Sequence, residues 1–162
     1  MHIYLMQHGT SLPETIDPEQ GVSPVGREEV ETSAAAARRM GLEFSDIFCS
    51  TKKRARQTAA LMALGTGFPE ADVAADTDFS PMADPERTLR RIHELRQGGS
   101  VLVCGHLPNL NRLACRLLGP GPEFAIAFEN AGLLCLSMDG PPRHTARLEW
   151  YLRPWQLASL AR

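Results

Sequence analysis

Short apolar segments alternate along the chain with longer segments in which apolar residues recur at helical spacing. The short segments are rich in β-branched residues and end at a glycine or a polar residue, which is typical of buried strands in a parallel sheet. The run 101–104 is the strongest of them, and 72–75 is the weakest. Strands are therefore predicted at residues 2–6, 46–49, 72–75, 101–104, 132–137 and 146–152.

Capping residues and apolar periodicity predict helices between these strands. The first helix begins at Ser23-Pro24 and is closed by Gly41. The second begins at Ser50 or Thr51 and ends before Gly65. Three more are predicted from 85 towards Gly98-Gly99, from 108 to 118, and from 154 onward. The expected inward faces are Val30, Ala34, Ala37 and Met40; Ala55, Thr58, Ala59 and Met62; Leu89, Ile92 and Leu95; and Leu110, Leu113, Ala114 and Leu117.

This order of elements predicts a three-layer α/β fold, with a mostly parallel sheet and helices on both of its faces. The Gly- and Pro-rich segments 119–122 and 139–142 are expected to be a loop and a turn rather than linkers. A length of 162 residues fits a single domain, which we place at 1–162.

Composition narrows the classes of function. A net charge of −2 argues against a nucleic-acid partner held by bulk charge. No apolar stretch has the length of a membrane span, and the first residues lack a secretory pattern. We therefore expect a cytoplasmic protein that binds neither nucleic acid nor membrane.

The four cysteines are expected to be reduced and mostly buried, because each lies in an apolar segment and none forms a CxxC pair. They are Cys49, Cys104, Cys115 and Cys135. A cysteine-dependent phosphatase needs an arginine six positions after the cysteine, whereas Cys49 leads to Ala55 and Cys104 to Leu110. Neither a metal site nor a cofactor is indicated.

The candidate chemistry lies where two strands end. Gln7-His8-Gly9 follows the first strand, and Gly105-His106 follows the strongest one. In open α/β sheets ligands bind outside the carboxyl ends of the strands, so the two histidines could share one pocket. A single loop histidine is usually just exposed or hydrogen-bonded, but two at matching strand ends favour a functional site.

A basic run, Lys52-Lys53-Arg54-Ala55-Arg56, follows a third strand end. By charge alone it could be a polyanion-binding patch. On a helix, however, successive side chains point about 100° apart, so only one or two of them can reach a site at the sheet edge. We assign Arg54 to the pocket and the other charges to the surface. The start of a helix also favours an anion.

Together these segments resemble the histidine phosphatase superfamily, whose fold is phosphoglycerate mutase-like. That family opens with Arg-His-Gly and continues with a Ser-x-x-x-Arg-Ala-x-Gln-Thr-Ala helix and a later Gly-His. Ser50–Ala59 and Gly105–Leu110 match the second and third motifs. The chain length, the short segment between Gly65 and Asp84 and the closing region 150–157 resemble small bacterial SixA-type phosphohistidine phosphatases.

The resemblance implies that His8 is the nucleophile and is transiently phosphorylated. Arg54 and His106 would hold the phosphoryl oxygens, with Gln7 and Gly9 completing the phosphate site. Gln7 departs from the family, which has arginine there, and a carboxamide brings no full charge. Another arginine, such as Arg27, could supply that charge instead.

No general acid stands out; the candidates are Glu14, Asp78, Asp84 and Glu86, of which Asp84 is better explained as a helix cap. A phosphorylated histidine needs less acid help than an ester. Three functions follow: a phosphatase for a histidine-phosphorylated protein such as a phosphotransfer domain, a phosphatase for small phosphomonoesters, or a weakly active module that binds phospho-ligands.

Overall fold

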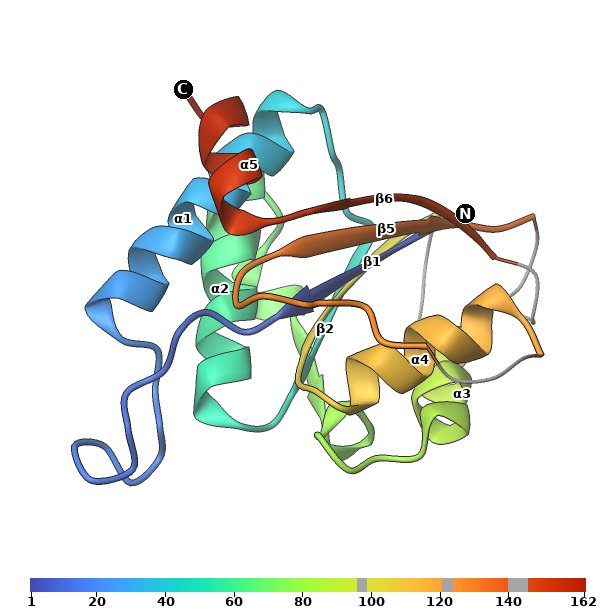
Figure 1. Ribbon diagram of the computed structural model, residues 1–162, viewed down its shortest axis with the longest axis horizontal. Helices are drawn as coiled ribbons and strands as arrows, with labels where there is room; N and C mark the ends of the chain where they lie inside the picture. Colours follow the sequence, from blue (N-terminus) through green and yellow to red (C-terminus); the bar gives the residue numbers. More distant parts are fainter. Residues whose placement is uncertain (96–98, 121–123, 140–145) are drawn as a thin grey trace.

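The strands of the computed structural model form one six-stranded sheet in the order β3-β2-β4-β1-β5-β6 (Figure 1). The structure describes residues 1–95, 99–120, 124–139 and 146–162. The elements are β1 (His2–Gln7), α1 (Pro24–Arg39), β2 (Asp46–Ser50), α2 (Lys53–Thr66), η1 (Glu70–Asp72), β3 (Ala74–Asp76), η2 (Thr77–Phe79), α3 (Pro85–Leu95), β4 (Ser100–Gly105), α4 (Asn109–Leu118), β5 (Leu133–Ser137), β6 (Arg147–Leu152) and α5 (Pro154–Leu160).

The four strands β3, β2, β4 and β1 are parallel to one another. β5 pairs with β1 in the antiparallel sense, and β6 pairs with β5 in the same way. Because the parallel strands all point in one direction, their carboxyl ends Gln7, Ser50, Asp76 and Gly105 lie at one edge of the sheet. The predicted mostly parallel α/β fold is confirmed.

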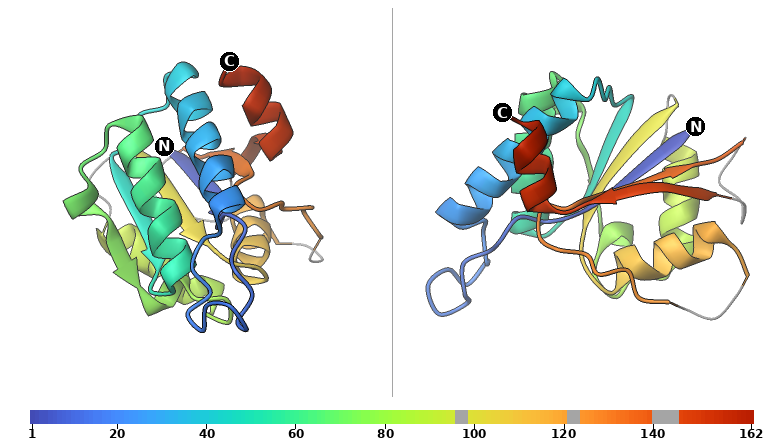
Figure 2. Two further views of the ribbon diagram at one scale, coloured as in Figure 1. Left: turned by 90° about the vertical axis from the view of Figure 1, so that its left-hand side faces the viewer. Right: turned by 45° about the horizontal axis from the view of Figure 1, so that its top comes forward.

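Helices cover both faces of the sheet, as Figures 1 and 2 show. Side chains alternate between the faces of a strand, so the neighbours Leu5 and Met6 of β1 belong to different cores. Met6 packs with residues of α1 and α2, and Leu5 packs with residues of α3 and α4. α5 lies beside α1 and adds Leu157 to the first core.

The second helix differs from the prediction at both ends. Ser50 is the last residue of β2, and α2 begins only at Lys53. Gly65 lies inside the helix. A Cβ at this position would be only 2.5 Å from the Cβ of Ala34 on α1. The glycine thus allows α1 and α2 to pack closely, and Gly67, with φ of 79°, ends the helix.

Smaller differences concern other boundaries. The weak strand lies at Ala74–Asp76 rather than 72–75, and a 3-10 turn takes up Glu70–Asp72. Pro108 precedes α4 as its N-cap. Met40, expected to face inward, is the partly exposed C-cap of α1. The other expected inward-facing residues that the structure describes are buried. Several predicted features lie outside the described residues: the side chain of Leu95, Gly98, Gly121-Pro122 and most of the turn at 139–142.

The four cysteines are all free and buried, as predicted. Burial raises the pKa of the Cys49 thiol to about 11 and that of Cys135 also to about 11. These thiols therefore stay protonated at neutral pH and fill space in the core.

Candidate active site

The pairing of β1 with β4 places His8 beside His106. Gln7 and Gly105 are partners in this parallel pair, and each is followed directly by one of the two histidines. The backbone N–H of His8 extends the pairing by donating to the carbonyl of Gly105 at 3.1 Å. The centroids of the two imidazole rings are consequently 4.9 Å apart, close enough for both rings to contact one phosphoryl group.

The hydrogen bonds of His8 select one ring nitrogen as the reactive one. Its Nδ1 lies 2.8 Å from the carbonyl oxygen of Gly9, which can only accept, so Nδ1 carries the proton. Nε2 then holds the lone pair and accepts from Nε of Arg54 at 3.1 Å. Burial, together with the charge of Arg54, lowers the pKa of His8 although the contact with Gly9 opposes this shift. The ring is therefore neutral and its Nε2 faces a cation.

His106 is almost completely buried, and neither of its ring nitrogens has a hydrogen-bond partner within the described residues. Burial, with the neighbouring His8, Arg54 and Lys52, lowers its pKa to about 3. Buried polar atoms without partners are costly and call for an explanation. A ligand that accepts and donates hydrogen bonds at this position would supply the missing partners.

Arg54 is the cation of the site, as expected from its position in the basic run. It lies in the first turn of α2, and its Nη1 donates to Oε1 of Gln20 at 2.9 Å. Gln20 belongs to the loop after β1 and has a positive φ of 51°. The guanidinium is thus held between His8 and Gln20, and its remaining N–H groups are available to an anion.

The other basic residues of the run do not join this contact. Lys53 instead forms ion pairs with two acidic residues of the loop after β1, Asp17 at 3.0 Å and Glu19 at 3.2 Å. Lys52 and Arg56 are exposed. Lys53 therefore fastens the loop after β1 to α2, which keeps Gln20 beside Arg54.

Gly9 packs closely against α1. A Cβ at Gly9 would lie 2.7 Å from the carbonyl oxygen of Gly26 and 2.7 Å from Val30. The N–H of Gly9 is also occupied, because it donates to Oγ1 of Thr58 at 3.0 Å. Thr58 in turn donates to the carbonyl of Arg54 at 2.8 Å, so this hydroxyl joins the two sides of the site. That Gly9 also contacts phosphate stays a prediction.

Gln7 is held by Asn130, in the segment before β5. Its Nε2 donates to Oδ1 of Asn130 at 2.7 Å, and Asn130 donates to Oγ1 of Thr10 at 3.2 Å. The other carboxamide atom, Oε1, is buried and without a partner among the described residues. Arg27 does not replace the missing charge, because it is exposed and pairs with Glu31 at 3.1 Å.

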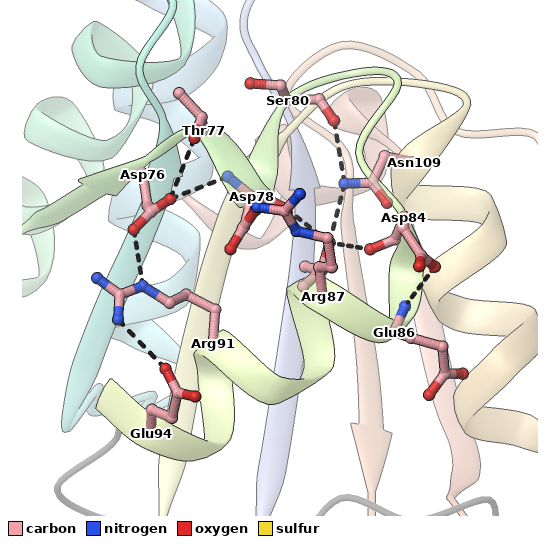
Figure 3. A network of polar contacts seen from close by, with 11 residues as sticks. Asp76, Thr77, Asp78, Ser80, Asp84, Glu86, Arg87, Arg91, Glu94 and Asn109 are labelled. Atoms are coloured by element: carbon pink, nitrogen blue, oxygen red, sulfur yellow. Dashed lines mark hydrogen bonds and ion pairs between the residues drawn. The ribbon is translucent and has the colours of Figure 1, made fainter.

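The acidic candidates are used elsewhere, as Figure 3 shows for Asp78 and Asp84. Asp78 pairs with Arg87 at 2.9 Å, and Asp84 accepts from the N–H of Glu86 at the start of α3. Glu86 itself pairs with Arg116. Glu14 is exposed on the loop after β1. The contacts found within the described ranges connect none of the four carboxylates to the two histidines.

Thr58, Gln20 and Asn130 are the residues that the sequence analysis did not assign to the site. Thr58 was predicted only as part of a buried helical face, although the matching Gln-Thr motif was a signal. Gln20 and Asn130 carry no such signal, because they lie in irregular segments whose path depends on tertiary contacts. Gln57 of the same motif also has a structural role, since its Oε1 accepts from the N–H of Val22 at 2.7 Å.

Three further observations concern the surroundings of the site and the rest of the described chain. A groove of about 490 Å³ lies beside α2 and is lined in part by Thr51, Lys53 and Arg56. Neither His8 nor His106 lines it. Within the part of the chain that the structure describes, no group of three or more His, Cys, Asp or Glu side chains could hold a metal ion. No helix there has the length and apolarity needed to cross a membrane.

Neither models of known protein families nor curated proteins match the sequence. Solved structures do match the fold. The protein histidine phosphatase SixA complexed with tungstate has a TM-score of 0.84 and 20% identity, covering 97% of this chain and 99% of that one. SixA from Agrobacterium tumefaciens has a TM-score of 0.74 and 23% identity, covering 94% and 97%. The mycobacterial glucosyl-3-phosphoglycerate phosphatase has a TM-score of 0.70 and 16% identity, covering 92% and 97%.

These structures share the α/β architecture with this chain across nearly its whole length. The fold expected from the sequence resemblance, that of the histidine phosphatases, is thereby confirmed. Fold alone does not specify a reaction, so the activity must be argued from the site.

Proposed function

We propose that this chain, with its histidine phosphatase fold, is a phosphatase that forms a phosphohistidine intermediate on His8, and that its substrate is phosphohistidine on a protein. The observation that carries the proposal is the set of unsatisfied polar atoms at the sheet edge. Among the described residues, the ring nitrogens of His106 are buried without partners, beside the neutral imidazole of His8 and the guanidinium of Arg54. A phosphoryl group provides hydrogen-bond partners for the imidazole N–H and for the cation.

In the first step Nε2 of His8 attacks phosphorus, and the bond from phosphorus to the leaving nitrogen breaks. His8 is ready for this attack because Nδ1 carries the proton and donates a hydrogen bond to the carbonyl of Gly9, which leaves the lone pair on Nε2. Nε2 must first lose its hydrogen bond from Arg54, whose Nε–H then takes a phosphoryl oxygen. The leaving imidazole retains the electron pair of the broken bond and is neutralised by a proton from solvent.

In the second step water attacks the phosphorus of phospho-His8, releases inorganic phosphate and restores the neutral ring. Arg54 and the N–H of His106 stabilise the charge on the equatorial oxygens in both steps. His106 is neutral without ligand, since its pKa is about 3. A bound phosphoryl dianion favours the cationic form of a nearby imidazole and so raises its pKa.

The surroundings of the site support a P–N bond over a P–O bond. An alkoxide leaving group needs a proton from an acid, but Asp78, Asp84 and Glu86 are engaged in the α3 contacts drawn in Figure 3 or with Arg116. An imidazole leaves more easily and does not need a positioned carboxylic acid. We therefore place phosphohistidine above small phosphomonoesters as the substrate.

The decisive experiment is to trap the phosphoenzyme. The protein is mixed with a phosphotransfer domain carrying a radiolabelled phosphohistidine, quenched with alkali, and digested for mass spectrometry. We expect label on His8 and none in His8→Ala, because Nε2 of His8 holds a lone pair and faces the guanidinium of Arg54. Label on a different residue, or release of phosphate by His8→Ala at the wild-type rate, would contradict the proposal.

Parallel turnover assays separate the alternatives. Hydrolysis of p-nitrophenyl phosphate faster than that of the phosphohistidine protein would favour the small-ester phosphatase. Gln7 favours a third possibility, a phospho-ligand binding module, since one cation fewer faces the phosphate. Saturable binding of inorganic phosphate with neither phosphoenzyme nor turnover would establish that function instead.

A further inference from the structure

A groove of about 290 Å³ lies between α1 and α5, and neither His8 nor His106 lines it. The two helices lie side by side in Figures 1 and 2. Val25 and Trp155 belong to its apolar lining, and they are 61% and 63% exposed. Aromatic side chains are enriched at recognition sites, so an exposed indole in a groove marks a candidate binding surface.

The charged residues of the groove have one sign. Of the residues that the structure describes, Glu28 and Glu29 line it and no basic residue does. The adjacent Arg27 lies outside the lining and is paired with Glu31. An aromatic face beside two carboxylates suits a side chain with an apolar stem and a cationic head.

Glu29 also connects the groove with the loop that follows His8. Its Oε2 accepts from the N–H of Thr10 at 3.2 Å. Thr10 accepts from Asn130, and Asn130 accepts from Gln7. The groove therefore opens a few contacts away from the candidate active site, within the reach of a macromolecule that occupies both.

We propose that the α1–α5 groove binds a lysine or arginine side chain of the phosphorylated protein partner. The stem of that side chain packs on Trp155 and Val25, and its charge lies between Glu28 and Glu29. The identification of the partner as the substrate rests on the proposed function, whereas the cation site itself does not. A protein substrate thus has a second contact that a small phosphomonoester lacks.

Direct binding can be measured without any phosphatase activity. Trp150→Phe leaves Trp155 as the single indole of the two in the chain. In this background we expect acetyl-arginine amide to change the Trp155 emission saturably, and acetyl-norleucine amide to leave it unchanged. Glu28→Gln should lower the affinity for acetyl-arginine amide about two- to fivefold at low ionic strength.

Equal responses to the arginine and norleucine probes would overturn the cation site, as would no saturable response to either. A dimer that forms on concentration and is lost in Trp155→Leu would overturn it as well, since a second copy would then occupy the groove.

Kinetics then test the role of the groove with substrate. Trp155→Leu should raise KM for the histidine-phosphorylated phosphotransfer domain about fivefold, with kcat unchanged and with turnover of a small phosphoramidate unchanged. Leu64→Ser, at an exposed apolar position of α2 outside the groove, is the matched control and should behave like wild type. Equal losses on the two substrates would overturn the role in substrate binding. If neither substrate is turned over while the arginine probe still binds, the proposed function fails and the groove stands.

Discussion

Gln7 and Asn130 are far apart in the sequence, yet Nε2 of Gln7 is 2.7 Å from Oδ1 of Asn130. The contact is fixed by the backbone, because the N–H of Ala131 donates to the carbonyl of Gln7 at 2.9 Å. The side-chain amide of Gln7 thus donates a hydrogen bond to Asn130. Its oxygen Oε1, which can only accept, has no partner among the described residues. An acceptor does not attract an anionic phosphoryl group.

A positive charge at this position should therefore assist the reaction. We expect Gln7→Arg to raise kcat/KM for the phosphohistidine substrate about tenfold, equivalent to roughly 1.4 kcal/mol of transition-state stabilisation. Steady-state kinetics check this, with Gln7→Met as a neutral control of similar length. An unchanged or lower kcat/KM in a folded Gln7→Arg protein would refute the missing-charge account.

Gln20 should act as a positioning residue for Arg54. Gln20→Gly removes the acceptor but suits the positive φ of 51°, so stability should change little while kcat falls about tenfold. Gln20→Glu keeps an acceptor and should restore most of the rate. Glu19→Gln is the control in the same loop, because Glu19 pairs with Lys53 and not with Arg54. Its kcat should stay close to that of the wild type. Loss of folding in Gln20→Gly, or failure of Gln20→Glu to recover activity, would speak against positioning.

Gly26 allows α1 to approach the loop after His8. A Cβ at Gly26 would lie 2.0 Å from the carbonyl oxygen of Thr10, which is part of the backbone and cannot simply turn aside. We expect Gly26→Ala to lower the free energy of unfolding by about 1–3 kcal/mol and to reduce activity. Gly99→Ala meets no atom within 4 Å and should change stability by less than about 0.5 kcal/mol. Urea denaturation of both variants makes the comparison.

The two histidines should make the protein sensitive to mild acid. Their folded pKa values lie below the usual 6.5, about 3 for His106, so in acid the unfolded chain binds protons that the native state does not. The stabilisation is present above pH 6.5 and is lost as the pH falls towards the folded pKa. Between about pH 6 and pH 5 His106 should lower the unfolding free energy by up to about 1.4 kcal/mol per pH unit, and His8 should act in the same direction.

His106→Gln removes one of these contributions, and its denaturation midpoint should depend less steeply on pH than that of the wild type. Identical pH dependence in the two proteins would show that His106 is already protonated in the native state.

The sequence was sufficient to predict the core and the meeting of the two histidines, because both depend on apolar strands and on where they end. Leu5 and Val103 are buried on one face of the sheet, and His8 and His106 follow the paired ends of the same two strands. A parallel α/β sheet allows few other arrangements.

Glycine was the harder residue type to interpret from the sequence. Gly65 was predicted to follow the end of α2, but it lies inside the helix, where α1 and α2 pack closely. A missing Cβ indicates a close approach without indicating by what. Asn130 could not be foreseen either, since its contact with Gln7 depends on how β5 pairs with β1.

The central position of β1 also determines when His8 becomes fixed during folding. Among the six strands of the sheet β1 comes first along the chain, but its sheet neighbours are β4 and β5, from the second half of the chain. Until Ser100–Gly105 has emerged, Ile3, Leu5 and Met6 have no strand to pair with and remain exposed apolar residues in a nascent chain. Such long-range pairing slows folding and leaves an aggregation-prone edge. The N-terminal half alone therefore cannot order His8, and chaperone demand during synthesis should be highest before β4 is complete.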